Sequence, residues 1–112
     1  MEATFGLAVR RENRTAVLIP TGKLDLSTAP ELEAELERAW QSLVEAVIVD
    51  LRAVSFMDST GLRVILSANQ KARANDVQFA VVEGSDQVRK LFDLTGVSER
   101  LTVVTVDEER LP

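Results

Sequence analysis

Short runs of strand-forming residues alternate with runs of helical periodicity along this chain, and this alternation limits its possible folds more than any other feature. Residues 46–51 (AVIVDL) form a nearly continuous apolar run, as expected for a strand covered on both faces. Residues 78–83 (QFAVVE) and 101–106 (LTVVTV) have the composition of further strands. Helical segments between strands favour parallel pairing, so the order predicts an α/β domain whose later strands are parallel.

The first part of the chain has a different pattern. Residues 4–10 (TFGLAVR) and 15–21 (TAVLIPT) are rich in strand formers, and the polar RENR between them predicts an antiparallel hairpin. Gly22 then breaks the strand pattern. Together with the later strands, this hairpin predicts a mixed β-sheet packed with α-helices.

A first helix is predicted over residues 29–43. Thr28 and Glu31 have the spacing of a capping box, and Pro30 is tolerated in a first turn. The apolar stripe of this helix, which we expect to be core, consists of Leu32, Leu36, Ala39, Trp40 and Leu43.

Two further helices are predicted. The second covers residues 60–74 and ends at Asn75 and Asp76. Ser85 is placed to cap the third, which ends near Gly96. The buried face of the third helix is predicted to contain Val88, Leu91 and Phe92. A last helical turn is expected over residues 107–111 (DEERL).

Composition excludes several classes of function. A chain of 112 residues fits one domain, here residues 1–112, and its 46% hydrophobic content suits a globular core. A net charge of −5 without a Lys/Arg cluster argues against nucleic-acid binding. The absence of cysteine excludes disulfides and thiol catalysis, and the absence of histidine removes the commonest general base. No GxxxxGK[ST] phosphate loop is present. We therefore expect a protein that is not an enzyme, with no cofactor and no metal site.

The sequence also bears on location. Its start, MEATFGLAVRRENR, lacks the apolar core of a signal peptide. No run approaches the roughly 18 apolar residues of a membrane span. We expect a cytoplasmic protein that does not bind membranes.

The segment Asp58, Ser59, Thr60 and Gly61 lies where a strand should lead into the second helix. Binding sites in open α/β sheets gather at the carboxyl ends of strands, and a helix N-terminus has unpaired N–H groups that favour negative charge. A phosphate on Ser59 could be held there without unfolding the domain. Spacing alone favours a simpler interpretation, in which Asp58 or Ser59 caps the helix.

Three motifs bear a resemblance to one family. VSFMDSTGLRVIL at residues 54–66 resembles the signature of STAS domains, specifically of bacterial anti-sigma-factor antagonists (anti-anti-sigma factors). TGKLDLSTAPEL at residues 21–32 is similar to the family's segment before the first helix, and VRKLFDLTGV at residues 88–97 to its Leu-Phe-x-x-x-Gly helix. The motifs occur in the family's order, so we expect a STAS-like fold.

The resemblance implies a regulatory cycle. The unmodified antagonist would bind an anti-sigma factor that is also a serine kinase and so release the sigma factor. The kinase would phosphorylate Ser59, with Thr60 as the second candidate, and a PP2C-type phosphatase would reverse the reaction. ATP and Mg²⁺ would belong to these partners, and the antagonist is expected to be a monomer. The implied partner-binding residues are Asp25, Asp58, Ser59, Thr60 and Gly61.

Some assignments stay open. Asp25 matches the family's aspartate before the first helix and would help to orient the kinase, or would be a turn residue that bonds its own backbone. We expect Phe56 to be core. Lys23 replaces a common acidic residue, which leaves the partner's identity open. The alternative function is a STAS scaffold or accessory subunit of a stress-signalling or transport complex that binds an anion or lipid.

Overall fold

The fold was analysed in a computed structural model, which describes residues 4–104. Its helices are α1 (Ala29–Gln41), α2 (Ser59–Ala74) and α3 (Asp86–Thr95), with a short 3₁₀ turn, η1 (Val97–Glu99). Its strands are β1 (Gly6–Glu12), β2 (Thr15–Leu24), β3 (Ala46–Asp50), β4 (Val54–Met57), β5 (Gln78–Val82) and β6 (Val103–Val104). The predicted α/β class and the mixed sheet are confirmed.

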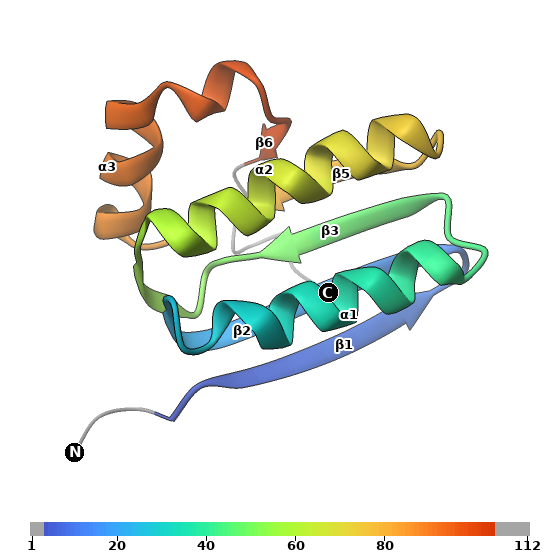
Figure 1. Cartoon of the computed structure of the whole chain (residues 1–112), viewed down its shortest axis with the longest axis horizontal. Coiled ribbons are helices and arrows are strands. Elements are labelled where there is room, and N and C mark those ends of the chain that lie inside the picture. The colour runs from blue at the N-terminus through green and yellow to red at the C-terminus, as the bar shows by residue number, and fades with distance from the viewer. Residues whose placement is uncertain (1–3, 105–112) are drawn as a thin grey trace, which may run out of the picture.

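The strands form one sheet in the order β1-β2-β3-β5-β6, and β4 pairs with β2 outside this path. The β1–β2 pair is antiparallel, and the β2–β3, β3–β5, β5–β6 and β2–β4 pairs are parallel. Figure 1 shows α1 and α2 side by side over one face of the sheet, while α3 packs against β4. The hairpin turn contains Asn13 at a φ of 56°, a conformation that asparagine tolerates.

The predicted sequence of elements omits β4, and this is the main correction. The expected break at Gly22 is instead a bend, where β2 continues with a φ of 87° and a shifted register. The N–H of Gly22 donates to the carbonyl of Ala53 at 3.1 Å, and this bond brings the start of β4 to β2. Thus β2 pairs with β3 through its first half and with β4 through its end.

The turn between β3 and β4 contains an ion pair whose carboxylate is buried. Asp50 is 6% exposed and accepts hydrogen bonds from Arg52 Nε at 2.9 Å and Arg52 Nη2 at 2.6 Å. Burial of Asp50 raises its pKa, but the hydrogen bonds and charge of Arg52, with the charge of Arg10, outweigh burial and lower it. The pair keeps a charged carboxylate at the end of β3, just before the chain enters β4.

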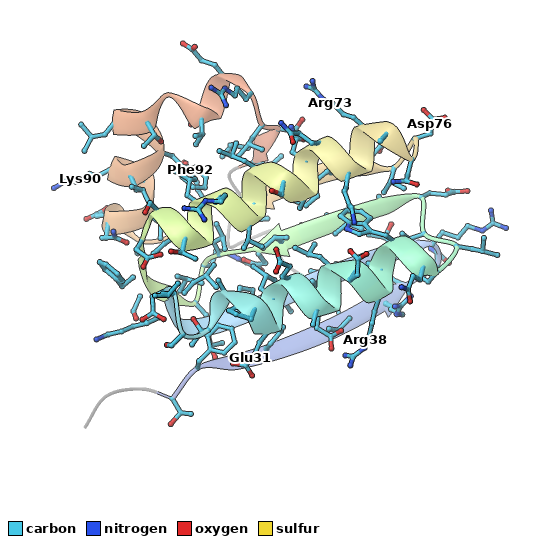
Figure 2. The ribbon with its side chains drawn as sticks, in the orientation of Figure 1. Glu31, Arg38, Arg73, Asp76, Lys90 and Phe92 are labelled. Atoms are coloured by element: carbon cyan, nitrogen blue, oxygen red, sulfur yellow. The ribbon has the colours of Figure 1, made fainter. Side chains whose placement is uncertain are left out.

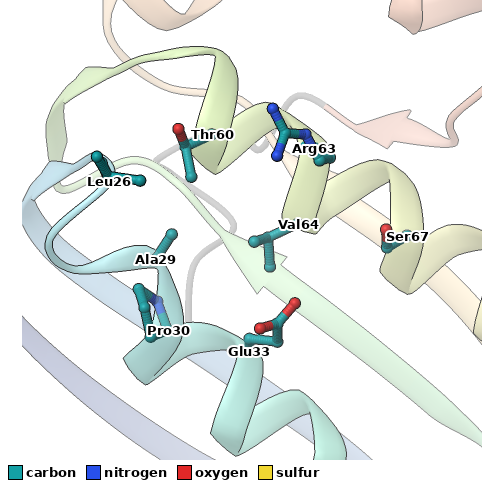
Figure 3. Close-up of a pocket in the computed structure, with 8 residues that line it drawn as sticks. All are labelled: Leu26, Ala29, Pro30, Glu33, Thr60, Arg63, Val64 and Ser67. Carbon is teal, nitrogen blue, oxygen red and sulfur yellow. The ribbon is translucent and has the colours of Figure 1, made fainter.

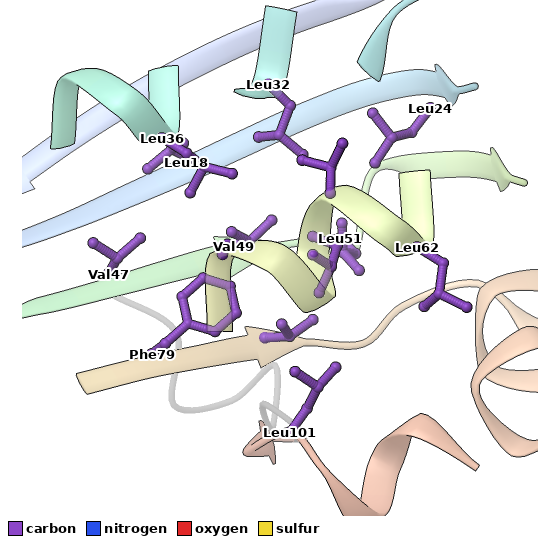
Figure 4. Close-up of a cluster of buried hydrophobic side chains, with 14 of the residues drawn as sticks. Leu18, Leu24, Leu32, Leu36, Val47, Val49, Leu51, Leu62, Phe79 and Leu101 are labelled. Atoms are coloured by element: carbon purple, nitrogen blue, oxygen red, sulfur yellow. The ribbon is translucent and has the colours of Figure 1, made fainter. Parts of the chain in front are cut away.

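The core lies between the sheet and the helices α1 and α2 (Figure 4). Val47 and Val49 of β3 have no exposed surface, whereas Ala46 and Ile48, which alternate with them, are half-buried. The strand is therefore covered fully on one face, and not on both as its apolar run predicts. Side chains that are completely buried each contribute roughly 1.5–3 kcal/mol to folding. They include Leu24, Leu32, Leu51, Met57 and Ile65.

Two details of α1 differ from prediction. The helix ends at Gln41, and Leu43 beyond it is 90% exposed instead of extending the apolar stripe. Trp40 packs at the edge of the core, partly buried. The predicted capping box is wrong, since Thr28 makes no side-chain bond to the helix N-terminus.

The third helix follows the sequence closely. Ser85 Oγ accepts a hydrogen bond from the N–H of Val88 at 3.3 Å, and α3 ends at Gly96 with a φ of 70°. Phe92 lies on the inner side of α3 and is fully buried, while Lys90 lies on the outer side (Figure 2). Leu91 packs at the edge of the core. The last strand, predicted over residues 101–106, begins only at Val103 and is observed at Val103–Val104, because Leu101 and Thr102 are outside any strand. Residues 105–106 and the turn predicted at 107–111 lie outside the described residues.

Candidate functional site

Ser59 is the first residue of α2 and is exposed. The chain reaches it from β4 through Met57, which is fully buried, and Asp58. The predicted start of this helix, Thr60, is therefore one residue late. The buried Met57 at the end of β4 and the buried face of α2 fix the position of Ser59 from both sides, while its own side chain meets solvent.

Asp58 caps α2. Its Oδ1 accepts hydrogen bonds from the N–H groups of Thr60 at 2.9 Å and Gly61 at 3.1 Å. The sequence analysis expected the N–H groups at the start of this helix to be unpaired and able to hold a phosphate. This expectation is corrected, because Asp58 already accepts from two of these N–H groups. Within residues 4–104, the hydroxyl of Ser59 has no hydrogen-bond partner. The cap interpretation thus applies to Asp58, and Ser59 is left free.

Gly61 allows α2 to begin unusually close to β2. A Cβ at this position would lie 2.9 Å from the carbonyl oxygen of Leu24 and 3.0 Å from the Cγ atoms of Leu24 and Met57. Real Cβ atoms essentially never approach a carbonyl oxygen this closely. The absence of a side chain at Gly61 therefore permits this close approach.

Asp25 organises the loop between β2 and α1. Its Oδ1 accepts hydrogen bonds from the N–H of Ser27 at 3.0 Å and from the Ser27 hydroxyl at 2.7 Å. The hydroxyl of Thr28 accepts from the N–H of Asp25 at 2.9 Å and donates to the carbonyl of Lys23 at 2.8 Å. The bond from the Ser27 hydroxyl lowers the pKa of Asp25 below its ordinary value of 3.8. Asp25 is therefore a turn residue, as one of the two interpretations held.

A surface groove joins the Asp25 loop to the start of α2 (Figure 3). Leu26 contributes from the loop, and Thr60 and Arg63 contribute from α2. Its other lining residues are Ala29, Pro30, Glu33, Val64 and Ser67. The structure thus brings together the two segments that the sequence singled out, around residues 25 and 59.

Two apolar side chains near Ser59 are exposed. Leu26 is 73% exposed and Phe56 is 40% exposed. The expectation that Phe56 is core is wrong, because β4 pairs with β2 alone and nothing in the described chain covers this side chain fully. Leu26 could have been noticed in the sequence, since it is an apolar residue in a polar loop and outside the helical stripe. Exposed apolar side chains of this kind suit a protein-docking surface.

Gln87 of α3 is a residue that sequence patterns did not indicate. Its side-chain amide bonds the backbone of Met57, 30 positions earlier, and Met57 is two residues before Ser59. No local signal in the sequence could have linked these two positions.

Among residues 4–104, no group of three His, Cys, Asp or Glu side chains converges as ligands for a metal ion. In the same part of the chain, no helix has the combination of length and apolar character needed to cross a bilayer.

Known proteins are similar to this chain in sequence and in fold. The chain is 35% identical over 82 residues to the anti-sigma-B factor antagonist of Staphylococcus aureus (strain NCTC 8325 / PS 47), covering 73% of this chain and 76% of that protein. A crystal structure of an anti-sigma factor antagonist from Mycobacterium paratuberculosis matches with a TM-score of 0.87 at 24% identity, covering 97% of this chain and 94% of the other. The anti-sigma factor antagonist SpoIIAA in its unphosphorylated form matches with a TM-score of 0.80 at 25% identity, covering 93% and 90%.

The comparison with family models agrees with these relatives. The model of the STAS domain matches residues 7–109, which include all three sequence motifs. The matched region contains the mixed sheet, the helices α1, α2 and α3, and the exposed serine at the start of α2. The chain therefore belongs to the STAS domain family.

Proposed function

We propose that this protein is an anti-sigma-factor antagonist: unphosphorylated, it binds an anti-sigma factor that is also a serine kinase, and phosphorylation of Ser59 switches binding off. The observation that carries the proposal is the state of Ser59, which is exposed at the first position of α2 with a hydroxyl that bonds nothing in the described chain. The names of the relatives, as antagonists of anti-sigma factors, support the same function.

The local charge supports a switch of this kind. A phosphoserine carries about −1.5 to −2 charges at neutral pH, and here it would stand next to the Asp58 carboxylate. Because Asp58 holds the N–H groups of Thr60 and Gly61, the new charge would be directed to solvent and to the partner. Leu26 and Phe56 beside it favour an apolar contact, which a nearby dianion would oppose through its desolvation cost.

The surroundings of the candidate hydroxyl groups support Ser59 as the phosphoacceptor. Thr60 is half-buried and lines the groove with Leu26, and its β-branched side chain is less free to rotate. Ser27 is exposed, but its hydroxyl donates to Asp25 at 2.7 Å. Ser59 has neither restriction, so we assign phosphorylation to it and leave Thr60 as the second candidate.

The five partner-binding candidates then divide by role. Ser59 and Thr60 present side chains to the partner, whereas Asp25, Asp58 and Gly61 shape the two loops that meet at the groove. ATP and Mg²⁺ would be bound by the kinase, and a PP2C-type phosphatase would remove the phosphate.

The test begins with copurification of a partner from cells that express the chain. An anti-sigma factor with kinase activity is expected, whereas a large scaffold or a transport complex would favour the alternative function and contradict the proposal. The partner is then incubated with ATP and with wild type, Ser59→Ala or Thr60→Val, and the intact masses are measured. We expect wild type and Thr60→Val to gain one phosphate and Ser59→Ala to gain none. Equal modification of Ser59→Ala would contradict the assignment.

A second measurement tests whether negative charge at residue 59 weakens binding to the partner. Ser59→Asp places one negative charge at the acceptor position, and we expect weaker binding to the partner by calorimetric titration. Ser59→Ala, which removes the hydroxyl without adding charge, is the control and should bind as wild type does. Unchanged affinity of Ser59→Asp would argue against repulsion as the mechanism.

A further inference from the structure

The side chain of Gln87 makes two hydrogen bonds to a single backbone residue near the candidate site. Its Oε1 accepts from the N–H of Met57 at 2.8 Å, and its Nε2 donates to the carbonyl of Met57 at 2.9 Å. Both lengths are within the normal range for N–H···O bonds. The amide thus satisfies both backbone polar groups of Met57, the residue directly before the cap Asp58.

At Met57, this contact takes the place of the hydrogen bonds that a neighbouring strand would make. β4 pairs with β2 on one edge, and the other edge of a strand presents unpaired N–H and C=O groups. A carboxamide has an acceptor and a donor side by side, so it matches the N–H and C=O of one strand residue. An ionised glutamate could only accept, and a methionine of similar length would do neither.

Gln87 is itself held firmly. It is the second residue of α3, and the next residue, Val88, is fully buried while its N–H is bonded to the Ser85 cap. Phe92, one turn further, is also fully buried. The amide is therefore anchored to the core and connects α3 to the end of β4, two residues from Ser59.

We propose that Gln87 is a positioning residue for phosphorylation of Ser59: through Met57 it keeps the Asp58 cap, and with it the serine hydroxyl, in one orientation toward the kinase. This rests on the function proposed above. In the reaction, Ser59 Oγ forms a bond to the γ-phosphorus of ATP, the bond from that phosphorus to the ADP oxygen breaks, and the hydroxyl proton passes to a base of the kinase. Phosphoryl transfer depends strongly on this alignment.

The proposed docking side chains, Leu26 and Phe56, are different from the Gln87–Met57 contact that positions Ser59. Loss of this contact should therefore change kcat and not KM. Both bonds of Gln87 go to Met57, and the pairing of β4 with β2 through Phe56 and Lys23 does not use them, so the affinity of the kinase for its substrate should be retained. Gln87→Met keeps the length of the side chain and removes both bonds. We expect kcat for phosphorylation to fall about tenfold while KM stays within about twofold. Gln87→Glu retains the acceptor for the Met57 N–H but sets its second carboxylate oxygen against the Met57 carbonyl, so its kcat should also fall below that of wild type.

The matched control is Gln70→Met on the exposed face of α2, since the Gln70 side chain makes no hydrogen bond within residues 4–104. It should leave kcat, KM and stability unchanged. Hydrogen exchange gives a readout without the kinase: the amides of Met57 and Thr60 should exchange faster in Gln87→Met and not in the control.

The outcomes are distinct. Wild type that is phosphorylated on Ser59, with an unchanged kcat in Gln87→Met, overturns the positioning role and leaves the proposed function standing. A variant that loses stability alone, with kcat equal to wild type, overturns it as well. Wild type that the partner kinase does not phosphorylate overturns both. A lower kcat at constant KM in a folded variant supports the inference.

Discussion

The two loops that flank the groove contain nearly the same residues and use them in opposite ways. The first, before α1, contains Asp25, Ser27 and Thr28, and the second, before α2, contains Asp58, Ser59 and Thr60. In the first loop the aspartate accepts from a serine hydroxyl, and the threonine hydroxyl bridges two backbone groups. In the second loop the aspartate accepts from two backbone N–H groups of the helix.

The difference lies in the spacing and in what each hydroxyl bonds. One residue, Leu26, separates Asp25 from Ser27, whereas Asp58 is followed directly by the first residue of its helix. In the first loop, the hydroxyl groups of Ser27 and Thr28 are therefore engaged in hydrogen bonds that stabilise the loop itself. The second satisfies its backbone through the carboxylate alone and leaves Ser59 free. The hydroxyl of Ser59 can stay free because Asp58 and Gly61 maintain the fold around it.

The largest expected effect on stability is that of Gly61→Ala. Its new Cβ would overlap the Leu24 carbonyl, and the better helix propensity of alanine offsets only part of that cost. We expect the free energy of unfolding in urea to fall by about 2 kcal/mol. Ser67→Ala, at an exposed position of the same helix, should remain within about 0.5 kcal/mol of wild type. A Gly61→Ala protein as stable as wild type would show that α2 is not fixed against β2.

The second largest expected effect on stability is that of Asp58→Ala. It leaves the N–H groups of Thr60 and Gly61 without their acceptor, and the loss of an N-cap costs about 0.5–2 kcal/mol. We expect a value of about 1.5 kcal/mol in urea unfolding because two donors are affected. Asp58→Asn, which keeps an acceptor oxygen, is the control and should recover most of the loss. Equal losses in the two variants would mean that charge, and not capping, holds the loop.

The two threonines provide a direct test of the comparison. Thr28→Val removes a bridge between Asp25 and Lys23 and should cost about 1 kcal/mol. Thr60→Val removes a hydroxyl that bonds nothing within residues 4–104, and should change stability by less than about 0.5 kcal/mol. Urea unfolding of both variants under one set of conditions measures the difference. If Thr60→Val proved the more damaging, the assignment of structural and free hydroxyls would be reversed.

The smallest effect concerns pH. The Ser27 hydroxyl lowers the pKa of Asp25 below 3.8, so this interaction stabilises the folded protein above that pH and is lost as the pH falls through the lower value. Ser27→Ala should raise the pKa of Asp25 toward its ordinary value, as measured by NMR titration of the carboxyl carbon. Ser59→Ala should not move it. An unchanged pKa in Ser27→Ala would remove the hydroxyl bond from the explanation.

Local patterns predicted much of the fold for an identifiable reason. The start of α3 at Ser85 and its end at Gly96 depend on contacts within one helical turn, which sequence spacing encodes directly. The β1–β2 hairpin depends on a short polar turn between two strand-forming runs. The strand-to-helix connection at Asp58 and Ser59 follows from the same kind of local signal.

The features that the sequence analysis did not predict correctly share another cause. β4 has four residues and no alternation, so only its pairing with the bent end of β2 identifies it as a strand. Phe56 is apolar, but its exposure depends on how much of β4 the rest of the chain covers. The capping box failed because the Thr28 hydroxyl found partners in Asp25 and Lys23.

The sequence by itself determined the α/β class, the order of most elements and the serine beside a capping aspartate, because these follow from periodicity and from contacts between near neighbours. Only the tertiary structure decided that β2 bends to accept β4, that two similar loops meet at one groove and that Gln87 closes the free edge of β4. Each of these joins positions distant in the chain, where many partners are compatible with the same local pattern and packing selects one.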